Sequence, residues 1–204
     1  MGDVQIGQSL SPSTSDLWSG DLELVAQILR KNRKATARFV ALCTDQVYGY
    51  VQWRLIPRLD LVDDLVQEIF LAAWGNLSKF RGDSSLQNWI LGIARHKVET
   101  HYRNCLREVQ LPGDGEDFDF LPVDLDGLEE SFNREQTESR VRETLGKLAE
   151  PYSVVLLWRY WEKRSLRDIA VETGKTEKAI ERLLARARNQ FRNKWNERHV
   201  ISRG

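Results

Sequence analysis

The chain has 204 residues, of which 41% are hydrophobic and 29% are charged, an ordinary composition for a soluble globular protein of one or two domains. Two cysteines cannot build a disulfide framework in a chain of this size. The first residues lack the basic and apolar segments of a signal peptide, and no apolar run is long enough to span a membrane. We therefore expect a cytoplasmic protein without membrane insertion.

The formal net charge is zero, but the charges are unevenly distributed along the chain. Residues 1–104 carry 12 basic and 11 acidic side chains, residues 105–150 carry 5 and 13, and residues 151–204 carry 13 and 6. An acidic middle part thus cancels a basic C-terminal part. The neutral total does not argue against a nucleic acid as partner, because such asymmetry is common in proteins that bind one.

Residues 1–20 are polar and rich in Ser and Thr, and we expect them to form a disordered extension. A helical pattern begins near Asp21, and a second one runs from Ala35 until Pro57 ends it. A third helix is predicted from Asp63. Its apolar stripe consists of Leu65, Val66, Ile69, Phe70, Ala73, Trp74 and Leu77. A different face carries Asp64, Gln67, Glu68 and Leu71, and it is acidic and hydrogen-bonding.

A basic loop, residues 76–83, follows this helix and holds Lys79, Phe80 and Arg81 before Gly82. Ser84 and Gln87 have the spacing of a capping box that would start the next helix. The predicted buried face of that helix is Leu86, Trp89, Ile90, Ile93, Ala94 and Val98. Its polar face is Asn88, Arg95, His96 and Arg103. Two alternatives stay open for Phe80, which could face a ligand with its basic neighbours or lie in the core.

Residues 105–132 are rich in acidic residues, with Pro and Gly, and are predicted to be a linker. Helical pattern returns near Asn133. Ser165 and Asp168 form a further capping signal, and Thr176 is a third cap. The residues Ala170, Gly174, Ile180 and Leu183 have the spacing of a helix-turn-helix. This motif needs a small residue where its helices cross, a left-handed turn between them, and apolar residues that hold the second helix.

The second helix of this motif is basic and carries the candidate DNA contacts. Lys178, Glu181 and Arg182 are the candidates for base edges, because they lie on its exposed N-terminal half. Lys175, Arg186 and Arg188 are expected to contact phosphates, and so to position the helix without specifying a sequence.

A metal site at His96, His101 and Cys105 is disfavoured. Residues five apart point in different directions on a helix, and the two that share a face are too few for structural zinc. No nucleophile–base motif or phosphate-binding glycine loop appears. We therefore expect neither an enzyme nor a cofactor.

Three segments resemble region 2 of bacterial sigma factors of the extracytoplasmic-function class: DLVQEIFLAAW, FRGDSSLQNW and the IAR that follows. The resemblance implies that Asp64, Gln67, Glu68 and Leu71 dock on the clamp helices of the largest subunit of core RNA polymerase. It also implies that the loop and the next helix open the minus-ten promoter element. The residues assigned to that element are Asn76, Lys79, Phe80, Arg81, Asn88, Arg95 and Arg103.

The segment from Glu150 to Arg188 resembles region 4 of the same family, which binds the flap of the second-largest subunit and reads the minus-thirty-five element. Lys175, Thr176, Lys178, Glu181, Arg182, Arg186 and Arg188 are the residues assigned to that element. Two positions depart from the family pattern. Thr100 stands where Asp is frequent, and Glu181 stands where a basic residue is frequent, so the promoter sequence cannot be transferred from the family.

The sequence thus predicts an all-α protein with two helical domains, residues 21–104 and 133–204, joined by the acidic linker. Its expected function is that of a dissociable RNA polymerase subunit that recognises and melts promoter DNA. The linker is either a solvated spacer or, as the resemblance implies, a segment that enters the polymerase, and its charge could hold the basic domain back in the free protein. The main alternative is a stand-alone helix-turn-helix regulator that uses its N-terminal helices to dimerise. The family is commonly inhibited by an anti-sigma factor, and the sequence leaves open whether this chain has one.

Overall fold

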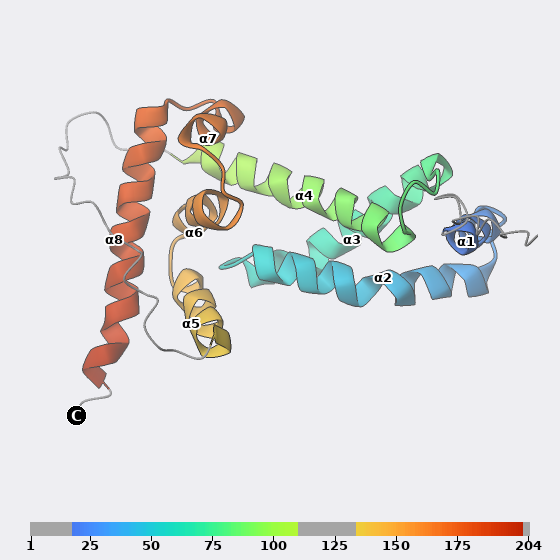
Figure 1. Cartoon of the computed structure of the whole chain (residues 1–204), viewed down its shortest axis with the longest axis horizontal. Coiled ribbons are helices and arrows are strands. Elements are labelled where there is room, and N and C mark those ends of the chain that lie inside the picture. Colours follow the sequence, from blue (N-terminus) through green and yellow to red (C-terminus); the bar gives the residue numbers. More distant parts are fainter. Residues whose placement is uncertain (1–17, 110–133, 202–204) are drawn as a thin grey trace, which may run out of the picture. The chain divides into compact units, whose positions relative to one another are not determined.

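The computed structural model describes residues 18–109 and 134–201, and every regular element within these ranges is helical. Figure 1 shows them in chain order. The elements are α1 (Ser19–Leu29), α2 (Arg33–Arg54), η1 (Leu59–Leu61), α3 (Val62–Asn76), η2 (Leu77–Lys79), α4 (Leu86–Glu108), α5 (Arg134–Gly146), α6 (Glu150–Leu156), η4 (Leu157–Trp161), α7 (Leu166–Thr173) and α8 (Glu177–Ile201). The all-α prediction is confirmed. The predicted extension and linker lie largely outside the described residues, although α4 continues to Glu108 and so includes the first four positions of the predicted linker.

Contacts divide the described residues into two compact units, 18–50 with 66–95, and 51–65 with 96–109 and 134–201. The first unit is built from α1 and from parts of α2, α3 and α4. Its fully buried side chains recur every four residues along the three longer helices, which is the spacing that keeps one helix face turned to the core. They are Phe39, Cys43 and Val47 of α2, Ile69 and Ala73 of α3, and Leu86, Ile90 and Ala94 of α4.

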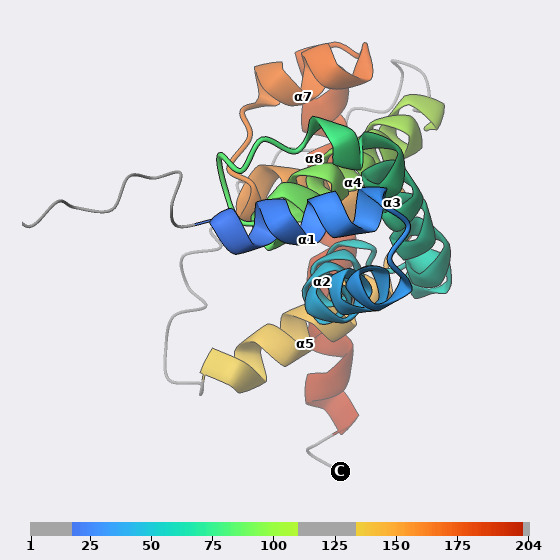
Figure 2. The same cartoon turned by 90° about the vertical axis from the view of Figure 1, so that its right-hand side faces the viewer.

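Helix α1 runs across the direction of α2, as Figures 1 and 2 show together. It buries Leu24, Val25 and Ile28 and packs against η2. The side chain of Leu22 lies over Gly82, where an added β-carbon would come within 3.0 Å of it. Gly82 also has a φ of +75°, so this loop position favours glycine for its conformation, and any side chain added there would also have to displace Leu22 slightly.

The second unit contains α5 to α8, together with the C-terminal part of α4. Helices α5, α6 and α7 each pack against α8. Trp158, Ile169 and Ile180 are completely buried within it. The hydroxyl of Ser153, which is also fully buried, donates to the main-chain carbonyl of Leu145 at 2.8 Å and so satisfies its polar group.

Candidate functional site

The polar face predicted on α3 lies on the surface. Asp64, Gln67, Glu68 and Leu71 are all exposed, while Ile69 and Ala73 on the opposite side of the same helix are completely buried. The four residues are three or four positions apart, so they follow one side of the helix. Leu71 is 65% exposed, more than any other leucine that the structure describes, and Trp74, three positions further on, is 47% exposed. This side of α3 is therefore an exposed surface with an apolar centre and charged or polar neighbours, the composition that is found at protein interfaces.

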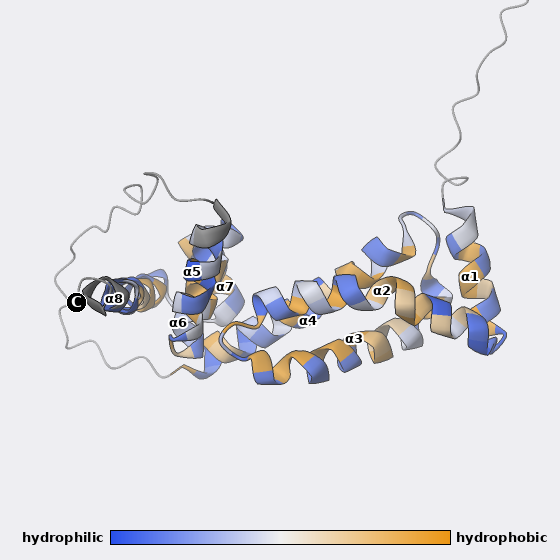
Figure 3. Cartoon of the chain, turned by 90° about the horizontal axis from the view of Figure 1, so that it is seen from below, coloured by the Kyte–Doolittle hydropathy of each residue, from blue (hydrophilic) through white to orange (hydrophobic). Residues whose placement is uncertain are grey.

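Trp74 belongs to this exposed surface, and its predicted place in the apolar stripe of α3 is wrong. Its side chain is 47% exposed, and it follows Leu71 by three positions. Figure 3 shows that hydrophobic residues occupy much of α3, which explains why the two faces are hard to separate by hydropathy alone. We call Asp64, Gln67, Glu68, Leu71 and Trp74 the α3 docking face.

The loop after α3 is held by local hydrogen bonds. The side-chain amide of Asn76 donates to the carbonyl of Ala72 at 2.9 Å, and its oxygen accepts from Nζ of Lys79 at 3.0 Å. Asn76 is therefore engaged in shaping the loop. Lys79 and Arg81 are exposed, so their charges are available to a ligand.

Phe80, between these two cations, points inward. It is only 8% exposed, and its ring meets the ring of Trp89 edge to face with 5.6 Å between the centroids. Of the two alternatives left open by the sequence, the structure favours a core position for Phe80. Its burial anchors the loop and leaves Lys79 and Arg81 on the outside.

Helix α4 begins one residue later than the sequence predicted. The hydroxyl of Ser85, not that of Ser84, accepts from the N–H of Asn88 at 3.1 Å, and a carboxylate oxygen of Asp21 accepts from the N–H of Leu86 at 2.8 Å. The predicted capping partner, Gln87, instead donates to the carbonyl of Leu42 at 3.0 Å. The cap of α4 is therefore supplied partly by α1, a contact between positions 65 residues apart.

The polar face of α4 is only partly available to DNA. Asn88 and Arg95 are exposed and lie in the same unit as the loop. Arg103 lies in the second unit, where its Nε is 3.2 Å from a carboxylate oxygen of Glu172. The structure therefore brings Asn76, Lys79, Arg81, Asn88 and Arg95 into one unit and places Arg103 in an ion pair elsewhere.

The helix-turn-helix has the local structure that the sequence predicts. Ser165 and Asp168 form a reciprocal capping box at the start of α7. Gly174 ends the helix in the left-handed conformation, with a φ of +69°. The hydroxyl of Thr176 accepts from the N–H of Ala179 at 3.1 Å and caps α8.

Packing between α7 and α8 follows the same pattern. Ala170 is 6% exposed, Ile180 is fully buried and Leu183 is 1% exposed.

The capping box also affects the ionisation of Asp168. Accepting hydrogen bonds from the side chain and main chain of Ser165 lowers the pKa of Asp168, with smaller effects of Arg164 and Arg167 in the same direction. The carboxylate is therefore kept ionised at the positive end of α7.

The seven residues assigned to the minus-thirty-five element differ in their exposure and in the hydrogen bonds that their side chains form. Lys178 and Thr176 are exposed, although the Thr176 hydroxyl serves as the cap. Lys175 donates to the carbonyls of Arg107 and Val109 at 3.3 and 2.9 Å. Arg188 donates to the hydroxyl of Tyr160 at 3.5 Å. The remaining residues, Glu181, Arg182 and Arg186, are half-buried on α8.

The two cysteines are unsuited to nucleophilic chemistry. Burial, with a smaller effect of Asp21, raises the pKa of Cys43 to about 11. Burial, followed by Glu150 and Glu108, raises the pKa of Cys105 to about 12. Both thiols therefore stay protonated near neutral pH.

In residues 18–109 and 134–201, no group of three or more His, Cys, Asp or Glu is arranged to hold a metal ion. Nε2 of His101 lies 2.7 Å from a carboxylate oxygen of Glu150. Across the same part of the chain, no helix is sufficiently long and apolar to cross a membrane.

Known protein families match both the N-terminal and the C-terminal helical regions of the chain. The family model for Sigma-70 region 2 matches residues 39–107, and that for Sigma-70, region 4 matches residues 138–191. The RNA polymerase sigma factor CnrH of Cupriavidus metallidurans is 30% identical over 173 residues, which are 82% of this chain and 90% of the relative. The ECF RNA polymerase sigma-E factor of Haemophilus influenzae is 27% identical over 180 residues, covering 85% and 94% of the two chains.

Among solved structures, the chain is similar to the sigma factor RpoE from Bartonella quintana, determined in complex with the anti-sigma factor NepR. The identity is 21%, the TM-score is 0.37, and the match covers 79% of this chain and 96% of the other.

Proposed function

The chain belongs to the extracytoplasmic-function class of RNA polymerase sigma factors, and from this premise we propose how its two helical regions divide the work of promoter recognition. As a sigma factor it binds core RNA polymerase, recognises and melts promoter DNA, and directs transcription initiation. The polymerase supplies the chemistry of RNA synthesis. We infer that this chain contributes binding and DNA opening only, and that it acts with the polymerase in the cytoplasm.

The α3 docking face is the proposed contact with core polymerase. One observation carries this assignment. On α3, Ile69 and Ala73 are completely buried on one side, while Leu71 at 65% and Trp74 at 47% are exposed on the other side beside Asp64, Gln67 and Glu68. Two large apolar side chains exposed three positions apart, with charged and polar neighbours, form an apolar patch with a polar rim, which is the pattern of an interface.

The loop of residues 76–83 is the proposed site for opening the minus-ten element. Lys79 and Arg81 are exposed on either side of the anchored Phe80, and Asn88 and Arg95 extend the polar surface along α4. Cations on a rigid loop attract the strand backbone, and amide groups can bond to the edge of an unstacked base. Phe80 would act by holding the loop in place.

The start of α8 is the proposed reader of the minus-thirty-five element. Lys178 is exposed in its first turn, and Glu181 and Arg182 follow on the next one. Residues near the N-terminus of a recognition helix reach the base edges of the major groove, where a cation prefers guanine and a carboxylate accepts from cytosine. Glu181 would thus shift the preferred sequence and leave binding to the duplex intact.

Transcription with purified components tests the proposal. Core polymerase supplied with this chain should start RNA synthesis at defined positions on genomic DNA fragments, whereas core alone should not. Replacing Lys79 and Arg81 together with alanine should abolish opening, measured by permanganate reactivity of thymines, while the complex with core polymerase persists. Transcripts from random positions, with and without the chain, would contradict the proposed function.

A further inference from the structure

A cluster of cations at the junction of α1 and α2 has no part in the functions assigned above. Arg30, Lys31, Arg33, Lys34 and Arg38 lie within nine residues that contain no acidic side chain. All five are exposed, and none of them forms an ion pair with another described residue. We call these five residues the basic corner. Its charges are not neutralised within the part of the chain that the structure describes.

The backbone conformation at Lys31 favours glycine, so the turn between α1 and α2 does not explain why a lysine stands there. Lys31 has a φ of +62°, in the left-handed region. It follows the end of α1, where its N–H donates to the carbonyl of Ile28 at 2.8 Å and the next N–H, that of Asn32, donates to Gln27 at 3.1 Å. Glycine is the favoured residue at this position of a helix end, because a β-carbon there costs about 1 kcal/mol. The chain carries a cation where glycine would fit better.

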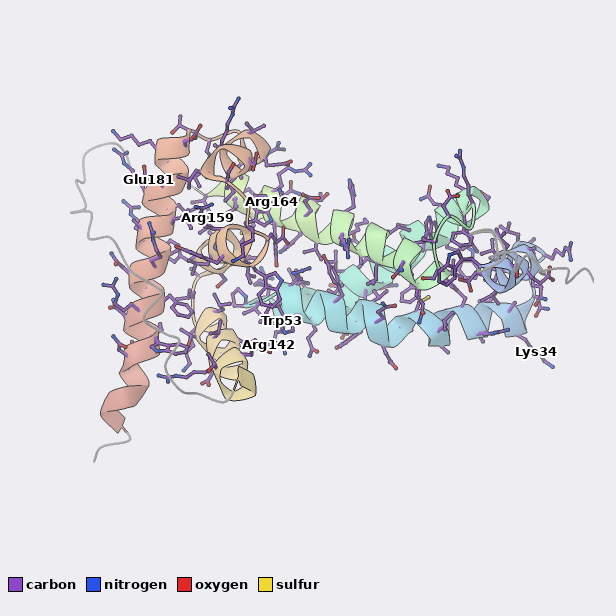
Figure 4. All side chains as sticks on the ribbon, in the orientation of Figure 1. Lys34, Trp53, Arg142, Arg159, Arg164 and Glu181 are labelled. Atoms are coloured by element: carbon purple, nitrogen blue, oxygen red, sulfur yellow. The ribbon has the colours of Figure 1, made fainter. Side chains whose placement is uncertain are left out.

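Asn32 fixes the other side of the junction. Its side-chain oxygen accepts from the N–H groups of Lys34 and Ala35 at 2.9 and 3.2 Å, which caps α2. Both helix ends at the corner are therefore satisfied by protein groups, and the turn between them is well defined. Figure 4 shows the side chain of Lys34 pointing away from the helices. The positive end of the α2 dipole adds to the field of the five cations.

The basic corner lies at a defined distance from the loop that is proposed to open DNA. Leu22 of α1 rests on Gly82 of that loop, and Asp21 caps α4. Arg30 follows Leu22 by eight residues, which corresponds to about 12 Å along a helix. A stacked strand advances about 3.4 Å per nucleotide, so this distance corresponds to roughly three or four nucleotides.

We propose that the basic corner binds the sugar–phosphate backbone of the promoter strand that flanks the opened bases, three or four nucleotides from the loop, without reading its sequence. This inference rests on the proposed function of the loop. The chemistry of the corner favours DNA over a protein partner, because residues 30–38 themselves expose no large apolar side chain that could form the centre of a protein interface. The exposed Leu29 and Val40 flank this segment in the chain, one on each side, and do not lie among its cations in the sequence. Residues 30–38 expose no aromatic ring for base stacking either, so the contact is limited to phosphates.

The test uses holoenzyme assembled from full-length protein and core polymerase, with a pre-melted DNA fragment selected in vitro by the wild-type holoenzyme. Affinity is measured over a series of salt concentrations for Arg33→Gln with Lys34→Gln. The slope of log K against log salt is negative, and each lost single-strand phosphate contact makes it shallower by about 0.7. The slope of the double variant should therefore be shallower by about 1.4, and its affinity for the DNA near 0.1 M salt should be lower by roughly 25-fold. Sequence preference and affinity for core polymerase should be unchanged.

Two further variants make the result specific. Lys31→Gly removes one cation and should make the slope shallower by about 0.7. It should not lower the unfolding temperature, because glycine suits the left-handed position. Lys147→Gln with Arg192→Gln removes two exposed charges elsewhere, and it should leave the slope at the wild-type value.

Three results would overturn the inference: a wild-type slope in the double variant, an equal change of slope in the Lys147 and Arg192 control, or weaker assembly with core polymerase while the holoenzyme that does form keeps the wild-type slope. The last would identify the corner as a protein contact. If the wild-type holoenzyme itself failed to form or to bind the fragment, the proposed function would fail instead, and the two failures are thereby distinguished.

Discussion

The main-chain N–H of Leu86, the first residue of α4, donates to a carboxylate oxygen of Asp21 at 2.8 Å. This bond ties α1 to the start of the helix that follows the loop of residues 76–83, the proposed site for opening the minus-ten element. Ser85 caps the same helix end from its own side. The position of the loop therefore depends on α1, a helix that itself carries none of the residues assigned to that element.

Replacing Asp21 with alanine should lower the free energy of unfolding by about 1 kcal/mol, because one N–H of α4 loses its acceptor and the helix dipole loses a nearby anion. Thermal unfolding followed by circular dichroism measures the change. Glu23→Ala is the matched control, since Gln27 of the same helix is the only hydrogen-bond partner of the exposed Glu23 carboxylate among the described residues. Its effect should stay within about 0.5 kcal/mol, and equal effects of both variants would refute the role of Asp21.

Trp74 is predicted to act in binding rather than in folding. Trp74→Ala should weaken the complex with core polymerase by about 2 kcal/mol, roughly 30-fold, because exposed tryptophans are frequent hot spots of interfaces. Its unfolding temperature should change little, because the ring is 47% exposed. Ile69→Ala, on the buried face of the same helix, should show the reverse, with a loss of about 2–4 kcal/mol of stability. Titration of labelled protein with core polymerase and thermal unfolding separate the two effects.

Gly174 should be sensitive to substitution for conformational reasons alone. An added β-carbon meets no atom within 4 Å, but the φ of +69° is unfavourable for any other residue than glycine. Gly174→Ala should therefore cost about 1 kcal/mol and weaken binding to duplex DNA. Gly92, exposed within α4 and without a positive φ, offers the opposite case, and Gly92→Ala should stabilise by about 0.5–1 kcal/mol. Chemical denaturation measures both, and a destabilised Gly92→Ala would contradict this explanation.

The stability of the helix-turn-helix should fall in acid because of Asp168. Its pKa is lowered in the folded state, chiefly by the hydroxyl and N–H of Ser165, so the folded protein holds this proton less tightly than the unfolded chain. The stabilisation is then complete above the ordinary carboxyl pKa of about 4 and is lost as the pH falls through the lower folded value. In Asp168→Asn this part of the pH dependence should be absent. The measurement is denaturant unfolding of both proteins between about pH 2 and 6, and identical pH profiles would disprove the assignment.

Much of the second unit could be predicted because its signals are local. The capping box at Ser165, the left-handed Gly174 and the cap at Thr176 each depend on residues within four positions, and all three are present as expected. Local rules of this kind need no knowledge of the tertiary structure.

Features that depend on distant partners were beyond such rules. Ser85 rather than Ser84 caps α4, Asp21 of α1 accepts from the N–H of Leu86, and Gln87 donates to Leu42 of another helix. Trp74 has the hydropathy of a core residue, and only the packing of α3 shows that it lies outside.

The charged residues show the same limit. Arg103 was grouped with the minus-ten residues by its helix face, but its partner Glu172 is 69 positions away. A basic side chain in a sequence gives no indication of whether a distant acid already neutralises it. The five cations of the basic corner show the opposite situation, because none of them has an acidic partner among the described residues. No motif in the sequence singles them out.

Binding to core RNA polymerase tests the central claim most directly. The purified chain and a variant with Asp64→Ala and Gln67→Ala are each mixed with core polymerase and analysed by size-exclusion chromatography. We predict a stable complex with the wild type and its loss in the variant, with unchanged unfolding temperatures because both residues are exposed. A wild-type chain that forms no complex, yet binds duplex DNA tightly and in a salt-sensitive manner by itself, would contradict the account and indicate a stand-alone regulator.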